Sequence, residues 1–306
     1  MAEVITTAEA VEAEAPPEAD GVLKRKLGIT FWLAVVVLVV IVGGCILNTT
    51  LPFVKDFRLP DASRTGRAQA FSSDHWLGTD NLGRDNLARI LEGGRTSLWI
   101  AFSVTLLGFV GGGLIGLVAG YFKGWTERIL MGVVDIFLAF PALVLALAII
   151  SVLESDQGAS VGAIILALSV IAVPPLARIT RATTLQFSQR EFVTAARSMG
   201  AGHFRIIRKE ILPNVLPPMV SFSLVVVAIV LVAEAGLGVI GLGLPPDKYP
   251  TWGNMISSGA RGITNALADH ASVALTPAAV VFLTVLSLNL IGDKLRQRFD
   301  VKESGV

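Results

Sequence analysis

The sequence is poor in charge and in the residues that build disulfide-linked or metal-binding proteins. Only 16% of its 306 residues are charged, whereas soluble domains average about 25%. It holds one cysteine, Cys45, so no intramolecular disulfide can form. Its three histidines, His75, His203 and His270, are far apart, and we expect no metal site. The formal net charge of +1 gives no reason to expect a nucleic-acid partner.

A phosphate-binding loop of the G-x-x-x-x-G-K-[ST] type is also absent from the sequence. We therefore do not expect the chain to hydrolyse ATP itself. The prediction is a protein that is not an enzyme, with no catalytic residues and no cofactor of its own.

Long apolar runs are abundant instead. Hydrophobic residues make up 53% of the sequence, and a helix needs about 20 apolar residues to cross a bilayer core about 30 Å thick. Six stretches qualify and predict an all-α integral membrane protein with six transmembrane helices: 27–47, 97–122, 130–153, 161–177, 219–242 and 272–291. The third contains Pro141, which a membrane helix tolerates better than a soluble one. In the second, Gly112, Gly116 and Gly120 repeat every four residues and predict a close helix contact.

The positions of lysine and arginine predict the orientation. If both ends of the chain face the cytoplasm, 16 of the 25 basic residues lie on that side. Of the other nine, seven lie in the long loop 48–96, where six acidic residues offset them. We therefore expect an N-in, C-in topology. The predicted segments are a disordered acidic tail (1–22), the first helix with an extracytoplasmic loop (23–96), a membrane domain (97–292) and a C-terminal tail (293–306).

The N-terminal apolar run has two alternative interpretations. It could be a signal peptide, or the sequence Val-Gly-Gly-Cys ending at Cys45 could be a lipoprotein cleavage site. The apolar region of a signal peptide is about 7–15 residues long, and this run is longer. Five further stretches already anchor the chain, so we expect Cys45 to be a small buried residue.

A basic segment, EFVTAARSMGAGHFRIIRKEILPN (191–214), separates the fourth and fifth apolar stretches. Ser188 and Glu191 have the spacing of a capping box, which predicts a first helix starting near Gln189. Gly200 is placed to end that helix. Its apolar residues share one predicted face: Phe192, Ala195, Ala196 and Met199.

A second helix is predicted from His203 to Leu212, stopping before Pro213. Its apolar stripe is Phe204, Ile207 and Ile211, and its basic edge is Arg205, Arg208 and Lys209. Such a helix pair could rest on lipid headgroups, read DNA as a helix-turn-helix, or bind a partner whose groove has acidic rims. DNA reading is the least supported, because the segment is short, tethered at both ends to membrane helices and not part of a basic domain.

The motif AARSMG…ILPN resembles the "EAA" loop of permease subunits of ATP-binding-cassette (ABC) importers. In that family the loop forms a coupling helix that sits in a cleft of the ATPase subunit. The resemblance implies that a set of hairpin residues couples this chain to an ATPase: Ala195, Ala196, Gly200, Phe204, Arg205, Ile207, Arg208 and Pro213. Thr194 and Glu210 depart from the family pattern, which leaves specific salt bridges unassigned.

Three further motifs narrow the resemblance. HWLGTDNLGRD (75–85) is similar to the HPLGTDxxGRD segment of C-type subunits of dipeptide, oligopeptide and nickel permeases. VIGLGLPPDKYPTWGN (239–254) and NLIGDKLR (289–296) are similar to two later motifs of the same family. The resemblance implies a type I ABC importer permease fold in a prokaryotic inner (cytoplasmic) membrane and ATP-driven import of peptides. Nickel or another small solute is the alternative substrate, and an ion-coupled secondary transporter is the alternative mechanism.

The resemblance also implies partners. A second, homologous permease would form a heterodimer with this chain and complete the translocation path. Two ATP-binding subunits or domains would hold ATP and Mg²⁺, and an extracytoplasmic substrate-binding protein would deliver the solute. Lipid surrounds the predicted helices, and no nucleic acid is expected.

Two acidic residues lie inside predicted membrane helices. Asp135 is in the third stretch and Glu234 in the fifth. Either could line the translocation path or fix helix packing, because ionisable residues in membranes are costly and often functional. We favour packing, since neither has a titratable neighbour one helical turn away.

Four residues are candidates for contact with the binding protein: Asp80, Arg84, Asp85 and Trp252. The first three belong to the segment 79–91, which predicts a short helix in which Asp85 and Arg89 pair at i, i+4. That helix could equally be an interfacial one that leads into the second span. Trp252 lies in a proline-rich stretch that could be an outer gate loop or an aromatic anchor at the membrane interface.

Overall fold

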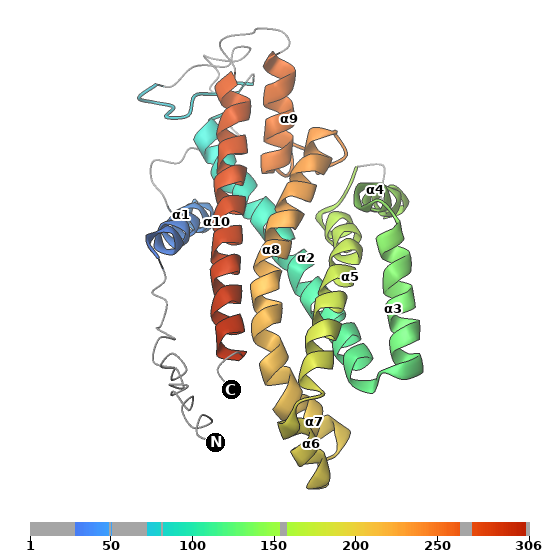
Figure 1. The fold of residues 1–306 in the computed structure, drawn as a ribbon. Helices are drawn as coiled ribbons and strands as arrows, with labels where there is room; N and C mark the ends of the chain where they lie inside the picture. The colour runs from blue at the N-terminus through green and yellow to red at the C-terminus, as the bar shows by residue number, and fades with distance from the viewer. Residues whose placement is uncertain are drawn as a thin grey trace, which may run out of the picture.

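The computed structural model describes residues 28–48, 50, 72–80, 82–153, 158–263 and 271–303, and every regular element in this part of the chain is a helix (Figure 1). The elements are α1 (Ile29–Leu47), α2 (Asn86–Phe122), α3 (Gly124–Ala139), α4 (Ala142–Leu153), α5 (Val161–Phe187), α6 (Glu191–Ser198), α7 (His203–Ile206), the π-helical turn η2 (Ile207–Ile211), α8 (Leu212–Val239), α9 (Trp252–Ile263) and α10 (Ala271–Glu303). The predicted tail 1–22 and most of the loop 48–71 lie outside the described residues.

Five helices are long and apolar enough to cross a membrane, namely those over 29–47, 86–122, 161–187, 203–239 and 273–298. Two of them begin well before the start that the sequence predicted. α2 begins at Asn86 rather than near residue 97, and the fifth predicted span begins at His203 rather than near residue 219. Both extensions are too polar for a hydropathy pattern to include, and they place loop motifs on the ends of membrane helices.

The predicted third span is broken. α3 and α4 are long and apolar enough to cross a membrane only when taken together, and they meet at an angle of 92°. The break falls at Pro141, which cannot continue a helix, and Phe140 before it is extended (φ −84°, ψ 139°). The single helix expected over 130–153 is therefore two helices, and the bent pair together still counts as a sixth candidate span.

α2 and α5 pack closely along the glycine face of α2. A Cβ atom on Gly112 would lie 2.6 Å from the carbonyl oxygen of Val173, and one on Gly120 would lie 2.7 Å from that of Arg181. Gly116 would meet the carbonyl oxygen of Ala177 in the same way. The predicted close helix contact is confirmed, because only hydrogen fits at these three positions.

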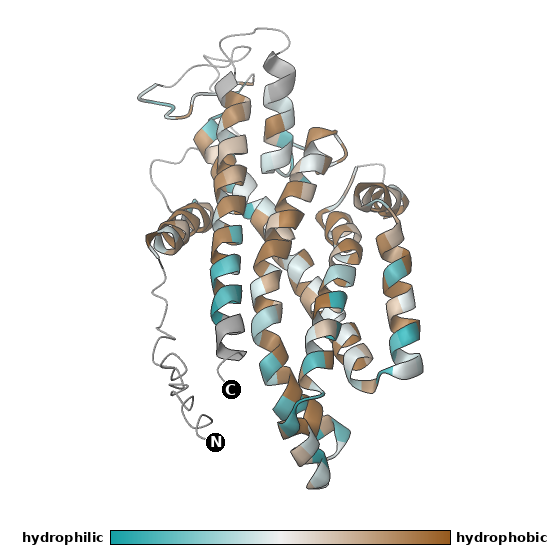
Figure 2. Cartoon of the chain, viewed as in Figure 1, coloured by the Kyte–Doolittle hydropathy of each residue, from teal (hydrophilic) through white to brown (hydrophobic). Residues whose placement is uncertain are grey.

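The remaining helices pack around this pair. α8 and α10 run side by side, and α1 is seen nearly end-on against α10, so it crosses α10 steeply (Figure 1). Phe31 and Ala34 of α1 pack against Ile291 of α10. Cys45 is buried, as predicted. Figure 2 shows apolar residues along the middle of the long helices and hydrophilic ones gathered around α6, α7 and the last described turns of α10.

Candidate functional sites at the two ends of the molecule

The turn from α5 into α6 differs from the predicted capping box. α6 begins at Glu191, and no side chain caps it. Ser188 still has helical backbone angles at the end of α5, so its hydroxyl donates backward to the Leu185 carbonyl oxygen at 2.9 Å. The predicted capping box is therefore wrong, because Ser188 completes the preceding helix, and α6 begins two residues after Gln189.

Gly200 ends α6 as predicted. Its φ of +80° lies in the left-handed region that favours glycine. The N–H of Gly200 donates to the Arg197 carbonyl oxygen and the N–H of Ala201 to that of Ala196, both at 3.0 Å. This pair of bonds is a Schellman motif. It fixes the angle between α6 and α7, which together with η2 we call the hairpin (191–211).

The hairpin is held by a small core of its own. Val193, Ala196, Ile206 and Ile211 are buried against Leu117, Tyr121 and Phe187 at the ends of α2 and α5. The Tyr121 hydroxyl lies 2.8 Å from His203 Nδ1 and adds a polar tether. The hairpin is thus fixed to the membrane helices on one side.

The other side of the hairpin carries exposed apolar side chains. Met199 is 81% exposed and Phe204 74%. Phe192 and Ala195 are exposed with them, while Ala196 is buried. The predicted apolar face of the first helix therefore divides into an inner part and an outer part. We call Phe192, Ala195, Met199 and Phe204 the outer apolar patch.

The second predicted helix does not stop at Leu212. α7, η2 and α8 form one helix of 37 residues from His203 to Val239. Pro213 lies at the junction of η2 and α8 and does not interrupt this helix. One wider turn precedes it, in which the Leu212 N–H donates to the Ile207 carbonyl oxygen five residues back. The hairpin is therefore a direct extension of a membrane helix.

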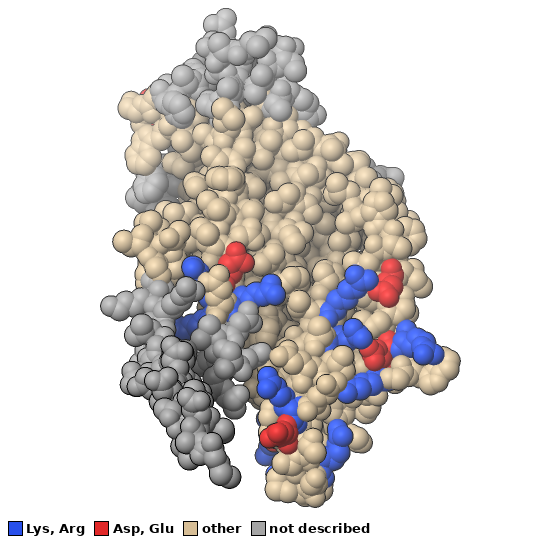
Figure 3. All heavy atoms as spheres, viewed as in Figure 1, with Lys and Arg blue, Asp and Glu red and all other residues tan. Residues whose placement is uncertain are grey.

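Basic residues border the outer apolar patch. Arg205, Arg208 and Lys209 are exposed, and no ion pair to them is found among the described residues. In the face shown in Figure 3, lysine and arginine gather over the hairpin and the neighbouring ends of the helices, while the upper part is almost free of them. A partner that binds here has to satisfy both exposed carbon and positive charge.

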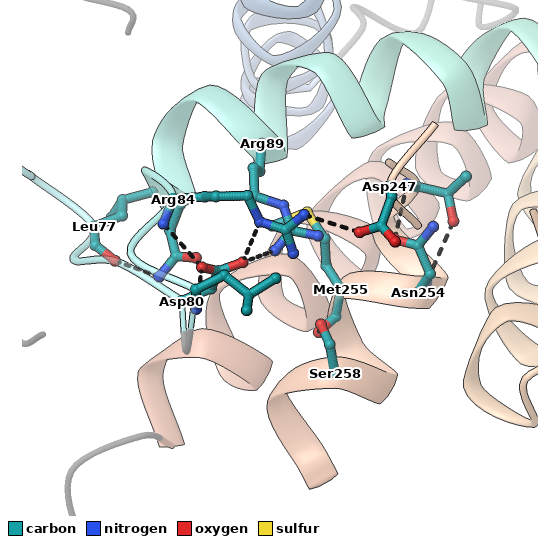
Figure 4. A network of polar contacts seen from close by, with 11 residues as sticks. Leu77, Asp80, Arg84, Arg89, Asp247, Asn254, Met255 and Ser258 are labelled. Carbon is teal, nitrogen blue, oxygen red and sulfur yellow. Dashed lines mark hydrogen bonds and ion pairs between the residues drawn. The ribbon is translucent and has the colours of Figure 1, made fainter. Parts of the chain in front are cut away.

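The opposite end of the molecule holds a set of paired charges, which we call the Asp80 network (Asp80, Arg84, Arg89 and Asp247); Asp80 and Arg89 are buried. Asp80 Oδ2 accepts from Arg84 Nε at 2.8 Å and from Arg89, whose residue is only 1% exposed. Asp80 Oδ1 accepts the backbone N–H of Leu82 and of Arg84, both at 2.9 Å. Arg84 also reaches Asp247 at 3.3 Å, so the network joins the loop before α2 to the loop before α9 (Figure 4).

The predicted helix over 79–91 is wrong in its first half. α2 starts only at Asn86, and Asp85 is its N-cap, accepting from the Ala88 N–H at 2.8 Å. Asp85 lies 2.7 Å from His75 Nδ1, and Arg89 pairs with Asp80. The expected Asp85–Arg89 pair does not form, because partners outside the helix take both side chains.

Trp252 is fully buried, so the interpretation as an aromatic anchor at the membrane interface is wrong. Its Nε1 donates to the Ile90 carbonyl oxygen at 2.9 Å, and its backbone N–H to Ser97 Oγ at 3.2 Å. Ser97 in turn donates to Glu234 Oε2 at 2.9 Å. Glu234 is buried too, so one serine ties α2, α8 and the start of α9 together.

The four residues predicted to contact a binding protein thus lie beneath the surface. Asp80, Asp85 and Trp252 are buried, and the side chain of Arg84 is only 14% exposed. In this chain, little of their surface is open to a partner, and they hold the shape of the surrounding loops. Ser97, Asp247 and Tyr121 were not predicted, since their bonds join residues far apart in the sequence.

Asp135 lies on an open face. Its Oδ1 accepts from Arg178 NH2 at 2.6 Å, and both side chains are more than half exposed. The titratable partner is on α5, not on the same helix. Arg178 was not predicted, because nothing in the sequence marks a pair between two helices.

These features agree with a comparison of the chain against protein families. Residues 112–302 match the family of binding-protein-dependent transport system inner membrane components. This chain belongs to that family. It is a multi-pass inner-membrane component of a transport system, and its family works with a binding protein and with ATPase subunits.

Two curated relatives in the family cover most of the permease chain. It is 38% identical over 231 residues to the glutathione transport system permease protein GsiD of Pectobacterium atrosepticum, spanning 76% of this chain and 74% of that protein. It is 33% identical over 270 residues to the dipeptide transport system permease protein DppC of Alkalihalophilus pseudofirmus, spanning 88% of this chain and 86% of that protein.

Solved structures agree on the fold of the permease. An inward-facing form of the MetNI methionine ABC transporter gives a TM-score of 0.55 at 22% identity, covering 69% of this chain and 95% of that one. An amino acid ABC transporter gives 0.52 at 19% identity, covering 69% and 94%. The predicted type I ABC importer permease fold is confirmed. Among the described residues, no group of three or more His, Cys, Asp or Glu side chains could hold a metal ion.

Proposed function

We propose that this chain is one permease subunit of an ATP-driven importer for peptides, with the hairpin as the element that couples it to an ATPase. The observation that carries the proposal is the outer apolar patch. Exposed Met199 and Phe204 stand on a hairpin whose opposite side is buried in the ends of α2 and α5. Exposed aromatic and methionine side chains on a rigid support are typical of a protein interface.

The basic edge specifies what the partner offers. Arg205, Arg208 and Lys209 fit a cleft with acidic rims. Because α8 continues from the hairpin without a break, a pull on the hairpin acts directly on a membrane helix. Closure of ATPase subunits around ATP would be converted in this way into movement of the spans.

ATP and Mg²⁺ bind to the partner subunits in this proposal, and this chain has no catalytic role. The absence of a phosphate-binding loop from the sequence supports that division. The complete importer comprises this chain, a second and homologous permease, two ATP-binding subunits or domains and an extracytoplasmic binding protein. Both chain ends and the hairpin face the cytoplasm, which the gathering of basic residues at that end supports (Figure 3).

The peptide substrate is supported by the relatives, whose names refer to glutathione and dipeptide transport. Both are small peptides with free charged termini. These two relatives do not point to import of nickel or to transport driven by an ion gradient.

The test is uptake of a labelled dipeptide and of labelled glutathione into liposomes that contain the whole importer. Phe204→Asp places a carboxylate in the outer apolar patch without disturbing the hairpin core, because that side chain is exposed. We expect it to release the ATPase subunits during size-exclusion chromatography and to lower ATP-dependent uptake at least about tenfold. Phe204→Leu, which keeps an apolar side chain, should retain most of both.

A Phe204→Asp complex that stays assembled and transports at the unmodified rate would show that the hairpin does not couple to the ATPase. Uptake by this chain alone under an ion gradient, without ATPase subunits, would exclude the importer mechanism altogether.

A further inference from the structure

The ion pair between Asp135 and Arg178 lies where lipid contact would be costly. Arg178 NH2 is 2.6 Å from Asp135 Oδ1, yet the side chains are 56% and 58% exposed. Both belong to helices of the membrane domain, α3 and α5. Charged groups that meet hydrocarbon are expensive and normally face a water-filled path or protein. This surface therefore belongs to the translocation path or to an interface.

The pair lies in the cytoplasmic half of the membrane domain. Asp135 is five residues beyond residue 130, where the predicted third span begins, and Arg178 directly follows the predicted fourth span, 161–177. At a rise of about 1.5 Å per residue, Asp135 is about 8 Å along the helix from that start. The pair is therefore close to the inner opening of a path between the spans.

The pair lies on a face of α5 that is exposed at Arg178 and, one turn later, at Ala182. The opposite side of α5 packs on the glycine face of α2. Along the open side, Ile171 and Pro175 are half-buried, and Arg178 and Ala182 are exposed. Pro175 lacks an N–H, so the carbonyl oxygen of Ile171, about two turns before Arg178, loses its usual helical donor. The open side thus combines a cation, an anion and a backbone acceptor.

We propose that Asp135 and Arg178 form half of a binding site for the charged termini of a peptide in transit. Arg178 binds the terminal carboxylate and Asp135 binds the terminal ammonium. The second permease supplies the other half of the site. The inference rests on the proposed import of peptides and names the groups in the path that recognise them.

The chemistry of the pair favours a ligand over a permanent contact. The only hydrogen bond found for the Arg178 side chain uses NH2, and a guanidinium has five N–H donors. When a peptide enters, its terminal carboxylate replaces Asp135 as the partner of Arg178, and its terminal ammonium replaces Arg178 as the partner of Asp135. No charge is left alone in a medium of low dielectric constant at either stage. A permanent interface would instead deplete charge at its centre.

A neighbouring pair on the same helices provides a matched control. Arg181 Nε lies 2.6 Å from Glu127 Oε1, and Arg181 NH2 binds the same oxygen. These side chains are 36% and 22% exposed, less than Asp135 and Arg178. Arg181 is three residues from Arg178, so it has similar depth but two nitrogens already committed.

The experiment measures protection of a cysteine introduced beside the pair. Ala182→Cys lies on the open side of α5, and the native Cys45 is buried. The importer carrying Ala182→Cys is treated with a maleimide while a zwitterionic dipeptide is titrated, without binding protein. The matched probe is the same dipeptide with an acetylated N-terminus and an amidated C-terminus. ATP-dependent uptake is measured on the same preparation.

We expect the zwitterionic dipeptide to slow labelling and the capped dipeptide not to. Adding Arg178→Gln or Asp135→Asn should raise the half-protecting concentration at least about tenfold, the loss of one charge-assisted contact. Arg181→Gln should leave it unchanged. No labelling, no protection, equal protection by the capped peptide, or protection that survives both substitutions would each overturn the site. Absence of ATP-dependent peptide uptake before any substitution would refute the proposed function instead.

Discussion

The two ends of the molecule place charged and apolar residues in opposite ways. At the hairpin end, Met199 and Phe204 face outward, and the basic edge is exposed. At the opposite end, Asp80 and Arg89 are buried together, and Trp252 is covered completely. Apolar groups are thus left outside where charge would be expected, and charges are placed inside where apolar groups would be expected.

This difference indicates that the two ends have different roles, one in binding and one in holding the structure. An exposed apolar patch on a rigid base is unfavourable in water and becomes favourable only when a partner covers it. A buried ion pair contributes little net stability, but removing one partner is costly. The hairpin end therefore favours binding of another subunit, whereas the charges at the opposite end hold its own loops in one arrangement.

The largest effect is expected from Asp80→Ala. It leaves Arg89 and Arg84 without the carboxylate that both of them contact. Loss of one member of a buried pair costs about 3–5 kcal/mol of unfolding free energy. Thermal unfolding of the purified complex, followed by tryptophan fluorescence, should show the loss, and the yield of folded protein should fall.

Asp247→Ala is the control for that substitution. Asp247 also pairs with Arg84, but its side chain is 85% exposed. Water screens such a pair, and its loss should cost less than about 1 kcal/mol. Equal, small effects of the two substitutions would mean that buried charge does not hold this end together.

Ser97→Ala tests the second buried connection at the same end. It removes the donor to Glu234 and the acceptor of the Trp252 N–H at once. Each of these groups is buried, and an unsatisfied buried group costs about 1–3 kcal/mol. The unfolding temperature of the complex should fall, although less than for Asp80→Ala.

Ser169→Ala is the matched control for Ser97→Ala. The hydroxyl of Ser169 is buried too, but it donates only to the Ile165 carbonyl oxygen within its own helix. Its loss should be close to neutral. If both serines proved equally dispensable, the link between α2, α8 and α9 would have no energetic weight.

Features set by local chemistry could be predicted from the sequence. Five apolar runs became membrane helices, and the glycine face of α2 packs on α5 as its spacing required. Gly200 ends α6 because left-handed backbone favours glycine wherever it occurs. In each case the residue type restricts the structure whatever surrounds it.

Features set by distant partners could not be predicted. Asp85 and Arg89 have the right spacing to pair on a helix, but Asp85 pairs with His75 and Arg89 pairs with Asp80 instead. Proline interrupts the helix at Pro141 but not at Pro213, which follows the wider π-helical turn η2 within a continuous helix. Trp252 gave no sign of burial, which depends on Ile90 and Ser97 far away in the chain.

At the hairpin end, Gly200→Ala should have a smaller effect on stability but a visible one on coupling. No atom lies within 4 Å of the added Cβ, so the cost is conformational. A non-glycine residue in the left-handed region costs about 1–2 kcal/mol. The angle between α6 and α7 becomes less defined, and fewer peptides should be imported per ATP hydrolysed.

Gly202→Ala is the control, since its φ of −71° suits any residue and no atom lies within 4 Å of the new Cβ. The ratio of uptake to ATP hydrolysis should stay close to that of the unmodified importer. If this ratio fell as far as it does for Gly200→Ala, the cause would be the added methyl group and not the backbone angle of the turn.

Tyr121→Phe should give the smallest effect. It keeps the buried ring and removes only the hydrogen bond between the Tyr121 hydroxyl and His203 Nδ1. One such bond contributes about 0.5–1 kcal/mol, so the fold should survive while the amides of α7 exchange hydrogen faster. Thr183→Ala is the control, because that hydroxyl donates only to the Ile179 carbonyl oxygen of its own helix. If exchange at α7 were unchanged, apolar packing alone would hold the hairpin on the membrane helices. Its angle would then depend on the Schellman turn and not on this tether.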